Sequence, residues 1–287
     1  MTRVAVLGTG KMGSAIARRL QAGGFQVSVW DRTKSKAEAL GVGPVADTPA
    51  DAARGADVVI SMVTGPQAIH DVYFGPDGVF QASSGKTIVD MSTTGPETAQ
   101  ELGRAAETND SKLIEAPVIG SVPAVNSGTL VIMAGATLPG DLDAVRPVLE
   151  RLGEVHYVGD QASAAALKLI ANSYLGIVST GAAELLAAGT AHGLDPEQVF
   201  NVLARLWPGL RLREAGYLKH VHEPTMFAER DLLKDLDLAL AFYRSAQPSN
   251  VPLTALTREI VAGVEAEGPD LDISAIVNAY GPERPRL

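Results

Sequence analysis

The segment QASAAALKLIANSYLGIVSTGAAELLAAG, residues 161–189, has a dense content of Ala, Leu and Ile and contains no proline. A helix of that length would span roughly 40 Å, which exceeds the diameter of a small domain. Apolar residues surround this segment instead of forming one stripe, which predicts a helix buried between two bodies. Lys168 and Asn172 are four residues apart and therefore lie on one face of the helix. We expect the helix to join two parts of the chain, with this pair facing the cleft between them.

Composition limits the function classes. The chain has 287 residues, 46% of them hydrophobic and 20% charged, as in ordinary soluble proteins of one or two domains. A net charge of −9 argues against a nucleic-acid partner. Without cysteine there is no thiolate metal site, and the five histidines lack metal-ligand spacing, so no metal is expected. Neither a signal-peptide pattern nor an uninterrupted apolar run is evident, so we expect a cytoplasmic protein with no membrane partner.

A glycine motif follows the first predicted strand. Residues 3–7 (RVAVL) form a β-branched run, which is followed by GTGKMG and then by helical spacing. In this order of strand, turn and helix, G-x-G-x-x-G predicts a dinucleotide site, with phosphate bound at the helix N-terminus. Gly8 would permit the tight turn, Gly10 would let a pyrophosphate approach, and Gly13 would let helix and strand pack closely. The other residues of this loop that we expect near the cofactor are Thr9, Lys11 and Met12.

A second strand is predicted at residues 26–30 (QVSVW), and its end bears on the choice of cofactor. Asp31 is placed to bind the adenosine ribose 2′-hydroxyl, which would indicate NAD. Arg32, Thr33 and Lys36 follow it, and two cations with a hydroxyl suit the 2′-phosphate of NADP. This charge count favours NADP, with NAD as the alternative. Arg32, Lys34 and Lys36 can also be interpreted as the solvated start of a helix.

Alternating strands and helices continue to about residue 160. Further strands are predicted at 57–62, 87–91, 112–115, 128–133 and 154–158. The fold class is therefore α/β, with an N-terminal Rossmann domain, a doubly wound parallel sheet, over residues 1–160. Val63 and Thr64 follow a strand at the sheet edge where such folds bind ligands.

The remainder of the chain, residues 161–287, is predicted to comprise the interdomain helix and an all-helical domain for substrate binding and dimerisation. Helical segments are expected at 196–206, 226–246 and 252–267, and residues 141–152 of the first domain are also predicted to be helical. A homodimer would cover the long apolar helix.

Short motifs recur in the order of a known family. They are G-x-G-x-M-G at Gly8 to Gly13, D-x-S-T-x-x-P at Asp90 to Pro96, D-A-P-V-S-G-G at Glu115 to Ser121, G-T-L at Gly128 to Leu130, K-x-x-N-N at Lys168 and Asn172, and K-D-L at Lys234 to Leu236. With these motifs the chain resembles the β-hydroxyacid dehydrogenases, which include 3-hydroxyisobutyrate dehydrogenases, tartronate semialdehyde reductases and glyoxylate/succinic semialdehyde reductases. It departs from their pattern at Ile119, where the family has serine, at Ser121, where it has the second glycine, and at Ala171 in the asparagine pair.

The resemblance implies hydride transfer between nicotinamide C4 and a small carbonyl compound or β-hydroxyacid. It implies Lys168 as proton donor or acceptor, with Asn172 hydrogen-bonding the substrate. Gly120, Ser121 and Ile119 would contact the substrate, Thr93 would approach the nicotinamide ribose, and Lys234 would lie over the cofactor.

Alternatives to these assignments remain. Lys168 can be a lysine whose head reaches water, Asn172 a polar contact between helices, and Ser92 and Thr94 a helix cap. The sister group of imine reductases has a W-N-R-T motif similar to Trp30 to Thr33, which suggests NADPH-dependent reduction of C=N as an alternative activity. A non-catalytic dinucleotide-binding protein is a further alternative.

Overall fold

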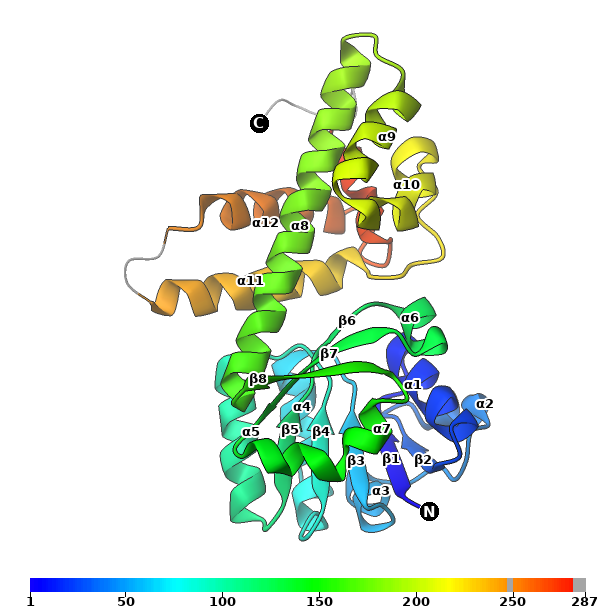
Figure 1. Ribbon diagram of the computed structural model, residues 1–287, viewed down its shortest axis with the longest axis vertical. Helices are drawn as coiled ribbons and strands as arrows, with labels where there is room; N and C mark the ends of the chain where they lie inside the picture. The colour runs from blue at the N-terminus through cyan, green and yellow to red at the C-terminus, as the bar shows by residue number, and fades with distance from the viewer. Residues whose placement is uncertain (247–249, 281–287) are drawn as a thin grey trace. The chain divides into compact units, whose positions relative to one another are not determined.

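The computed structural model describes residues 1–246 and 250–280 (Figure 1). Contacts within the chain divide it into two compact units, Met1–Lys168 and Leu169–Leu287. One continuous helix, α8 (Gln161–Ala191), contributes residues to both units.

A single mixed sheet forms the centre of the first unit. Its strands are β1 (Arg3–Leu7), β2 (Gln26–Trp30), β3 (Val58–Ser61), β4 (Thr87–Asp90), β5 (Lys112–Glu115), β6 (Val118–Ile119), β7 (Leu130–Ala136) and β8 (Gly153–Gly159). They follow the order β2-β1-β3-β4-β5-β7-β6, and β8 pairs with β7. The strands β2-β1-β3-β4-β5 are parallel, whereas β7 is antiparallel to both β5 and β6. The α/β fold class predicted from the alternating pattern is confirmed, and the sheet is parallel over the part that follows the Rossmann order.

Helices cover both faces of this sheet. They are α1 (Lys11–Ala22), α2 (Lys34–Leu40), α3 (Pro49–Arg54), α4 (Gly65–Phe74), α5 (Pro96–Thr108), α6 (Val122–Ser127) and α7 (Arg146–Leu149), with 3₁₀ turns η1 (Val79–Gln81) and η2 (Pro139–Ala144). Successive residues of β1 enter different apolar clusters: Val4 and Val6 join one, and Ala5 and Leu7 join the other. Such burial on both sides explains why the parallel strands read as nearly continuous apolar runs.

Two predicted helices differ from the observed elements. The segment 141–152 divides into η2 and the short α7, because Pro147 has no amide hydrogen with which to continue a helix from η2. The helix predicted at 226–246 begins only at Glu229, as α11 (Glu229–Ser245). The Asp272 carboxylate accepts hydrogen bonds from the amides of Met226, at 2.9 Å, and Phe227, at 3.1 Å, and so holds these residues outside the helix.

The second unit contains helices and 3₁₀ turns, with one isolated antiparallel bridge between Ala228 and Asp272 in its described part. Besides α8 and α11 it contains α9 (Pro196–Leu206), α10 (Glu214–Lys219) and α12 (Pro252–Glu265), with 3₁₀ turns η3 (Pro208–Arg213) and η4 (Ile273–Tyr280). Its core is an apolar cluster that includes Leu186 of α8, Phe200 of α9 and Leu232 of α11.

Helix α8 is long and apolar. By length and composition it is a candidate membrane span, with an 18-residue window of mean hydropathy 1.2. Half of that window is buried inside the protein, and a core helix meets the same criterion. The buried face of α8 also carries polar side chains, among them Asn172, Ser173 and Ser179, as expected for packing against other protein elements.

Candidate active site

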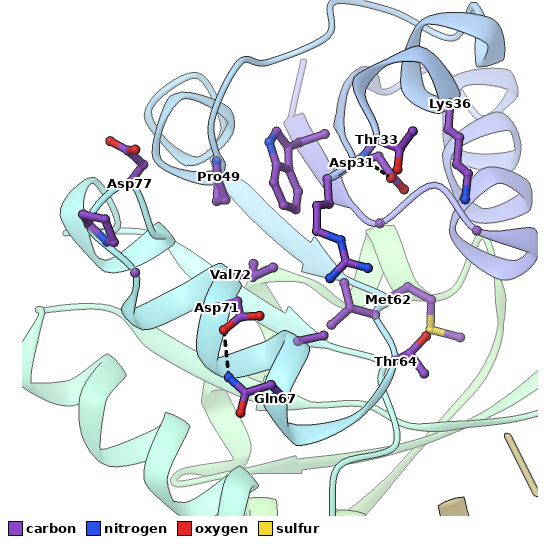
Figure 2. A pocket seen from close by; sticks show the side chains of 18 residues that line it. Asp31, Thr33, Lys36, Pro49, Met62, Thr64, Gln67, Asp71, Val72 and Asp77 are labelled. Carbon is purple, nitrogen blue, oxygen red and sulfur yellow. Dashed lines mark hydrogen bonds between the residues drawn. The ribbon is translucent and has the colours of Figure 1, made fainter. Parts of the chain in front are cut away.

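A cavity of about 630 Å³ opens in the first unit where β1, β2 and β3 end (Figure 2). The chain leaves β1 toward β2 on one side and returns to β3 on the other, so this is the point where the strand order reverses. Open α/β sheets bind ligands at such a position. The predicted site residues that line the cavity are Gly8, Gly10, Asp31, Arg32, Thr33, Lys36, Val63 and Thr64.

The glycine turn between β1 and α1 has the geometry that dinucleotide binding requires. Gly8 has φ +94°, and a Cβ there would lie 2.4 Å from the carbonyl oxygen of Met62. A Cβ on Gly13 would lie 1.9 Å from the carbonyl oxygen of Gly8, so only glycine lets α1 approach β1 this closely. A Cβ on Gly10 would meet no described atom within 4 Å. The open space therefore lies at the residue where a pyrophosphate would approach.

Both carboxylate oxygens of Asp31 accept hydrogen bonds from neighbouring residues of the protein. Its Oδ2 accepts hydrogen bonds from the Thr9 amide at 2.7 Å and the Thr9 hydroxyl at 2.9 Å, and its Oδ1 accepts one from the Thr33 amide at 2.8 Å. Partial burial raises the pKa of this carboxyl, but the hydrogen bonds from Thr9 and Thr33 and the charge of Lys36 outweigh burial and leave the pKa below its usual value. Asp31 is therefore ionised at neutral pH and ties the glycine turn to the end of β2.

The basic side chains after β2 separate into two groups. Arg32 and Lys36 line the cavity together with the hydroxyl of Thr33, and Figure 2 shows Thr33 and Lys36 on its rim. Lys34 instead pairs with Asp47, with a distance of 2.5 Å between Nζ and Oδ1. Arg32, Lys34 and Lys36 are all exposed, so the alternative of a solvated helix start stays a prediction.

The opposite wall of the cavity consists of residues that the sequence analysis missed. Figure 2 shows Pro49, Gln67, Asp71 and Asp77 there, and Gln67 Nε2 donates to Asp71 Oδ1 at 2.8 Å. The sequence feature that could have indicated them is the four-residue spacing of Gln67 and Asp71, which places both on one face of α4. This helix begins directly after the Val63–Thr64 loop.

Hydrogen bonds connect the ends of β3 and β4. The amide of Val63 donates to Ser92 Oγ at 3.0 Å, and the amide of Ser92 donates to Asp90 Oδ1 at 3.1 Å. Helix α5 takes Gly95 as its N-cap residue, so Ser92 is not a helix cap. Ser92 fixes the Val63 loop, and Thr93 follows it directly in the chain.

Lys168 is anchored to the first unit. Its Nζ donates to the carbonyl oxygen of Val118 at 2.8 Å. Ile119, the next residue, has 45% of its surface exposed. Gly120 and Ser121 complete the loop, and Ser121 occupies the N-cap position of α6 without a capping hydrogen bond from its side chain. The loop predicted to bind substrate therefore lies beside the lysine amine.

Asn172 belongs to a polar cluster of the second unit. Its Nδ2 donates to Asp235 Oδ2 at 2.5 Å, and Lys234 Nζ lies 2.5 Å from Asp235 Oδ1. Asp235 has only 2% of its surface exposed. Asn172 thus does make a polar contact between helices, and Asp235, which was not among the predicted site residues, links two that were.

Known proteins resemble the chain over nearly its whole length. The family profile described as the NAD binding domain of 6-phosphogluconate dehydrogenase matches residues 3–159, and the profile described as NAD-binding of NADP-dependent 3-hydroxyisobutyrate dehydrogenase matches residues 162–280. The 3-hydroxyisobutyrate dehydrogenase of Pseudomonas aeruginosa is 35% identical over 299 residues, which cover 98% of this chain and 99% of that protein. The chain belongs to the β-hydroxyacid dehydrogenase family.

Further relatives agree with this membership. Glyoxylate/succinic semialdehyde reductase 2, a chloroplastic protein of Arabidopsis thaliana, is 31% identical over 284 residues, covering 96% of this β-hydroxyacid dehydrogenase and 78% of the relative. The structure of Psf3 in complex with NADP⁺ and 2-OPP superposes with a TM-score of 0.87 at 29% identity, covering 97% of this chain and 100% of that one. An imine reductase from Pseudomonas sp. shares the fold, with a TM-score of 0.63 at 20% identity over 98% and 99% of the two chains.

As a β-hydroxyacid dehydrogenase, the protein is an oxidoreductase that binds NAD(P). The cavity fits such a cofactor, because the glycine turn leaves room at Gly10 and directs the N-terminus of α1 at the same space. Arg32, Thr33 and Lys36 offer cations and a hydroxyl near the end of β2, where the adenosine ribose binds in this fold.

Proposed function

We propose that the protein reduces a small carbonyl compound, or oxidises the corresponding β-hydroxyacid, with Lys168 as the proton donor or acceptor. The observation that carries this proposal is the 2.8 Å hydrogen bond from Lys168 Nζ to the carbonyl oxygen of Val118. That bond fixes a lysine amine beside the Ile119–Ser121 loop, and a lysine that simply extended into water would have no need of it.

A bound nicotinamide supplies or accepts the hydride. The protein's part is to orient the substrate and to move a proton. In the reducing direction, negative charge develops on the carbonyl oxygen, and the Lys168 ammonium would stabilise that charge and then donate a proton from Nζ. In the oxidising direction the neutral amine would accept the hydroxyl proton. The bond to Val118 uses one of the three hydrogens of the ammonium.

Asn172 lies one helical turn beyond Lys168, about 6 Å along α8. We propose that its amide contacts the substrate and that Asp235 orients it through the bond to Nδ2. Asp235 also binds Lys234, which we propose lies near the cofactor. A single buried carboxylate would then hold both side chains in place.

Ile119, Gly120 and Ser121 are proposed to contact the part of the substrate next to its carbonyl group. The exposed Ile119 side chain offers an apolar surface, whereas Ser121 offers a hydroxyl. This mixture favours a semialdehyde or glyoxylate-like substrate in which one polar group reaches Ser121.

We also propose NADP as the preferred cofactor. Asp31 uses both carboxylate oxygens to bind Thr9 and Thr33, while Arg32 and Lys36 line the cavity. The cations are therefore available to a 2′-phosphate.

The test is a spectrophotometric screen of NADPH and NADH oxidation with glyoxylate, succinic semialdehyde, tartronate semialdehyde and a cyclic imine. Lys168→Met should lower kcat for the best carbonyl substrate at least 100-fold and leave NADPH binding within twofold. Lys219→Met, at an exposed lysine of α10, serves as the control and should match the wild type. Undiminished carbonyl reduction by Lys168→Met would rule out the proposed role, and turnover of the cyclic imine alone would point to C=N reduction instead.

A homodimer formed through α8 and the second unit, in the cytoplasm, is part of the same proposal. Ile170, Tyr174 and Leu185 expose 49%, 61% and 55% of their surfaces on α8. Apolar side chains of this size on one helix are typical of a subunit interface. Light scattering coupled to size-exclusion chromatography should give twice the mass of one chain.

A further inference from the structure

Three polar residues lie in one row across the sheet of the first unit. Ser61, Asp90 and Glu115 are the last residues of β3, β4 and β5, and they are register partners of one another in turn. Register partners on parallel strands direct their side chains to the same face, about 4.8 Å apart. All three residues are fully buried. Two carboxyl groups therefore lie side by side in the interior.

Asp90 receives the hydrogen bonds of this row. Its Oδ1 accepts from the Ser61 hydroxyl at 2.7 Å and from the Ser92 amide at 3.1 Å. The Tyr73 hydroxyl of α4 in turn donates to Ser61 Oγ at 2.7 Å. Donors aligned in this way stabilise a carboxylate and strengthen one another.

Glu115 has the opposite environment. Neither of its carboxyl oxygens has a hydrogen-bond partner within the part of the chain that the structure describes. Burial, and then the charge of Asp90, hold the pKa of Glu115 well above its usual range. Burial also leaves the pKa of Asp90 above its usual value, but the hydrogen bonds from Ser61 and Ser92 oppose the shift, and no such bonds oppose it at Glu115. Since adjacent buried acids cannot both ionise at low cost, the charge belongs on Asp90 and Glu115 stays neutral.

The row is connected to the cofactor cavity. Ser92, held by Asp90, accepts a hydrogen bond at its Oγ from the amide of Val63 at 3.0 Å. Val63 and its neighbours Met62 and Thr64 line the cavity to which we assign the cofactor. The position of this wall therefore depends on Asp90 through Ser92.

We propose that Asp90 is a positioning residue for cofactor binding: as the ionised member of a buried acid pair, it fixes the Met62–Thr64 wall through Ser92. Glu115 is the uncharged member of the pair, so the negative charge lies on Asp90, which accepts hydrogen bonds from Ser61 and Ser92. Both side chains are fully buried, so neither is placed to contact a substrate directly. The proposal rests on NAD(P) binding alone and does not depend on the role of Lys168.

The test compares the dissociation constants of NADPH and NADH, measured by isothermal titration calorimetry, among matched variants of the full chain. Asp90→Asn and Ser92→Ala should each weaken NADPH binding about tenfold, while Glu115→Gln, a neutral isostere of the protonated acid, should stay within twofold of the wild type. Ser83→Ala is the control. Ser83 is also fully buried, precedes β4 at the opposite end, and interacts with Ser111 at 3.3 Å. Its loss should lower stability without changing the dissociation constant.

Kinetics distinguish positioning from general damage to the fold. At saturating NADPH, Ser92→Ala should retain kcat within about twofold while its KM for NADPH rises, and Ser92→Thr should restore the KM because it keeps the hydroxyl. Wild-type cofactor affinity in Asp90→Asn and Ser92→Ala would overturn the proposal. So would Glu115→Gln weakening NADPH as much as Asp90→Asn does. If Asp90→Asn does not fold, the Ser92→Ala and Glu115→Gln values decide the question.

Discussion

Asp31 illustrates how far a single position can be read from sequence. Its place at the end of β2 predicts a carboxylate near the adenosine ribose, and it does line the cavity. Both of its oxygens nevertheless bind Thr9 and Thr33. Sequence cannot show this, because the bond to Thr9 spans 22 residues and exists only once β1 and β2 have paired.

The same limit applies elsewhere in the site. The glycine turn was predictable because each glycine meets a local steric requirement. Gln67, Asp71 and Asp235 were missed because packing decides which helix face meets the cavity of the first unit and which meets Asn172 in the second.

Cofactor preference gives the first prediction at this scale. Arg32→Ala and Lys36→Ala should each lower kcat/KM for NADPH by about 10- to 100-fold, the loss expected for a charged hydrogen bond to phosphate. Values for NADH should change less than threefold. Lys34→Ala is the matched control, since Lys34 pairs with Asp47. Equal losses with both cofactors would mean that these side chains do not contact a 2′-phosphate.

The substrate loop gives the second prediction. Ile119→Ser should raise kcat/KM for glyoxylate and tartronate semialdehyde about tenfold, because a hydroxyl beside Lys168 adds a donor for a carboxylate. Leu138→Ser, at a residue with 62% of its surface exposed before η2, should change neither. Steady-state kinetics with both substrates provide the measurement, and a fall in both values would place Ile119 in an apolar contact that the substrate requires.

At the scale of elements, agreement with the sequence was closest where one residue type sets a boundary. The bounds predicted for β1, β2, β5 and α9 agree with the observed ones, because short β-branched runs or a Pro-led helix start define them. The helices predicted at 141–152 and 226–246 differ from the observed ones. Pro147 interrupts the first, and the Asp272 carboxylate binds the amides before α11.

The β1–α1 turn gives the third prediction. Gly10→Ala should fold normally, since φ at this residue is −65° and its Cβ has room, but the methyl group should weaken NADPH binding at least tenfold by occupying the pyrophosphate approach. Gly13→Ala should instead lower the melting temperature by several degrees, because its Cβ would collide with the carbonyl oxygen of Gly8. Calorimetry and thermal unfolding measured on both variants check the contrast, which fails if Gly10→Ala binds NADPH like the wild type.

On the scale of the whole molecule, each unit has its own apolar clusters and its own buried acids. In the second unit Glu229 is fully buried, and its carboxyl oxygens have no hydrogen-bond partner among residues 1–246 and 250–280. Burial, followed by the charge of Asp272, raises the pKa of Glu229 to about 8, although Arg213 opposes the shift. The predicted function gave no reason to expect a buried acid at Glu229. Neither periodicity nor a motif in the sequence distinguishes this residue from a surface glutamate.

Stability should therefore depend on pH in a defined direction. Between the ordinary value of 4.5 and about 8, the folded protein holds a proton on Glu229 that the unfolded chain releases, so the free energy of unfolding falls as pH rises through this range. Glu229→Gln removes that loss and should raise the melting temperature by several degrees at pH 8, with little difference near pH 4.5. Glu259→Gln, at a side chain 71% exposed, should show no such trend. A melting-temperature gain for Glu229→Gln that is equal at both pH values would contradict the assignment.

The continuity of helix α8 bears on the spacing of the proposed catalytic residues. The first unit ends at Lys168 and the second begins at Leu169, yet the backbone stays helical through this junction. The helical backbone of α8 therefore sets the spacing between Lys168, the proposed proton carrier, and Asn172. A motion that leaves α8 helical would keep this spacing. Substitutions in either unit could then change the substrate without changing the distance between Lys168 and Asn172.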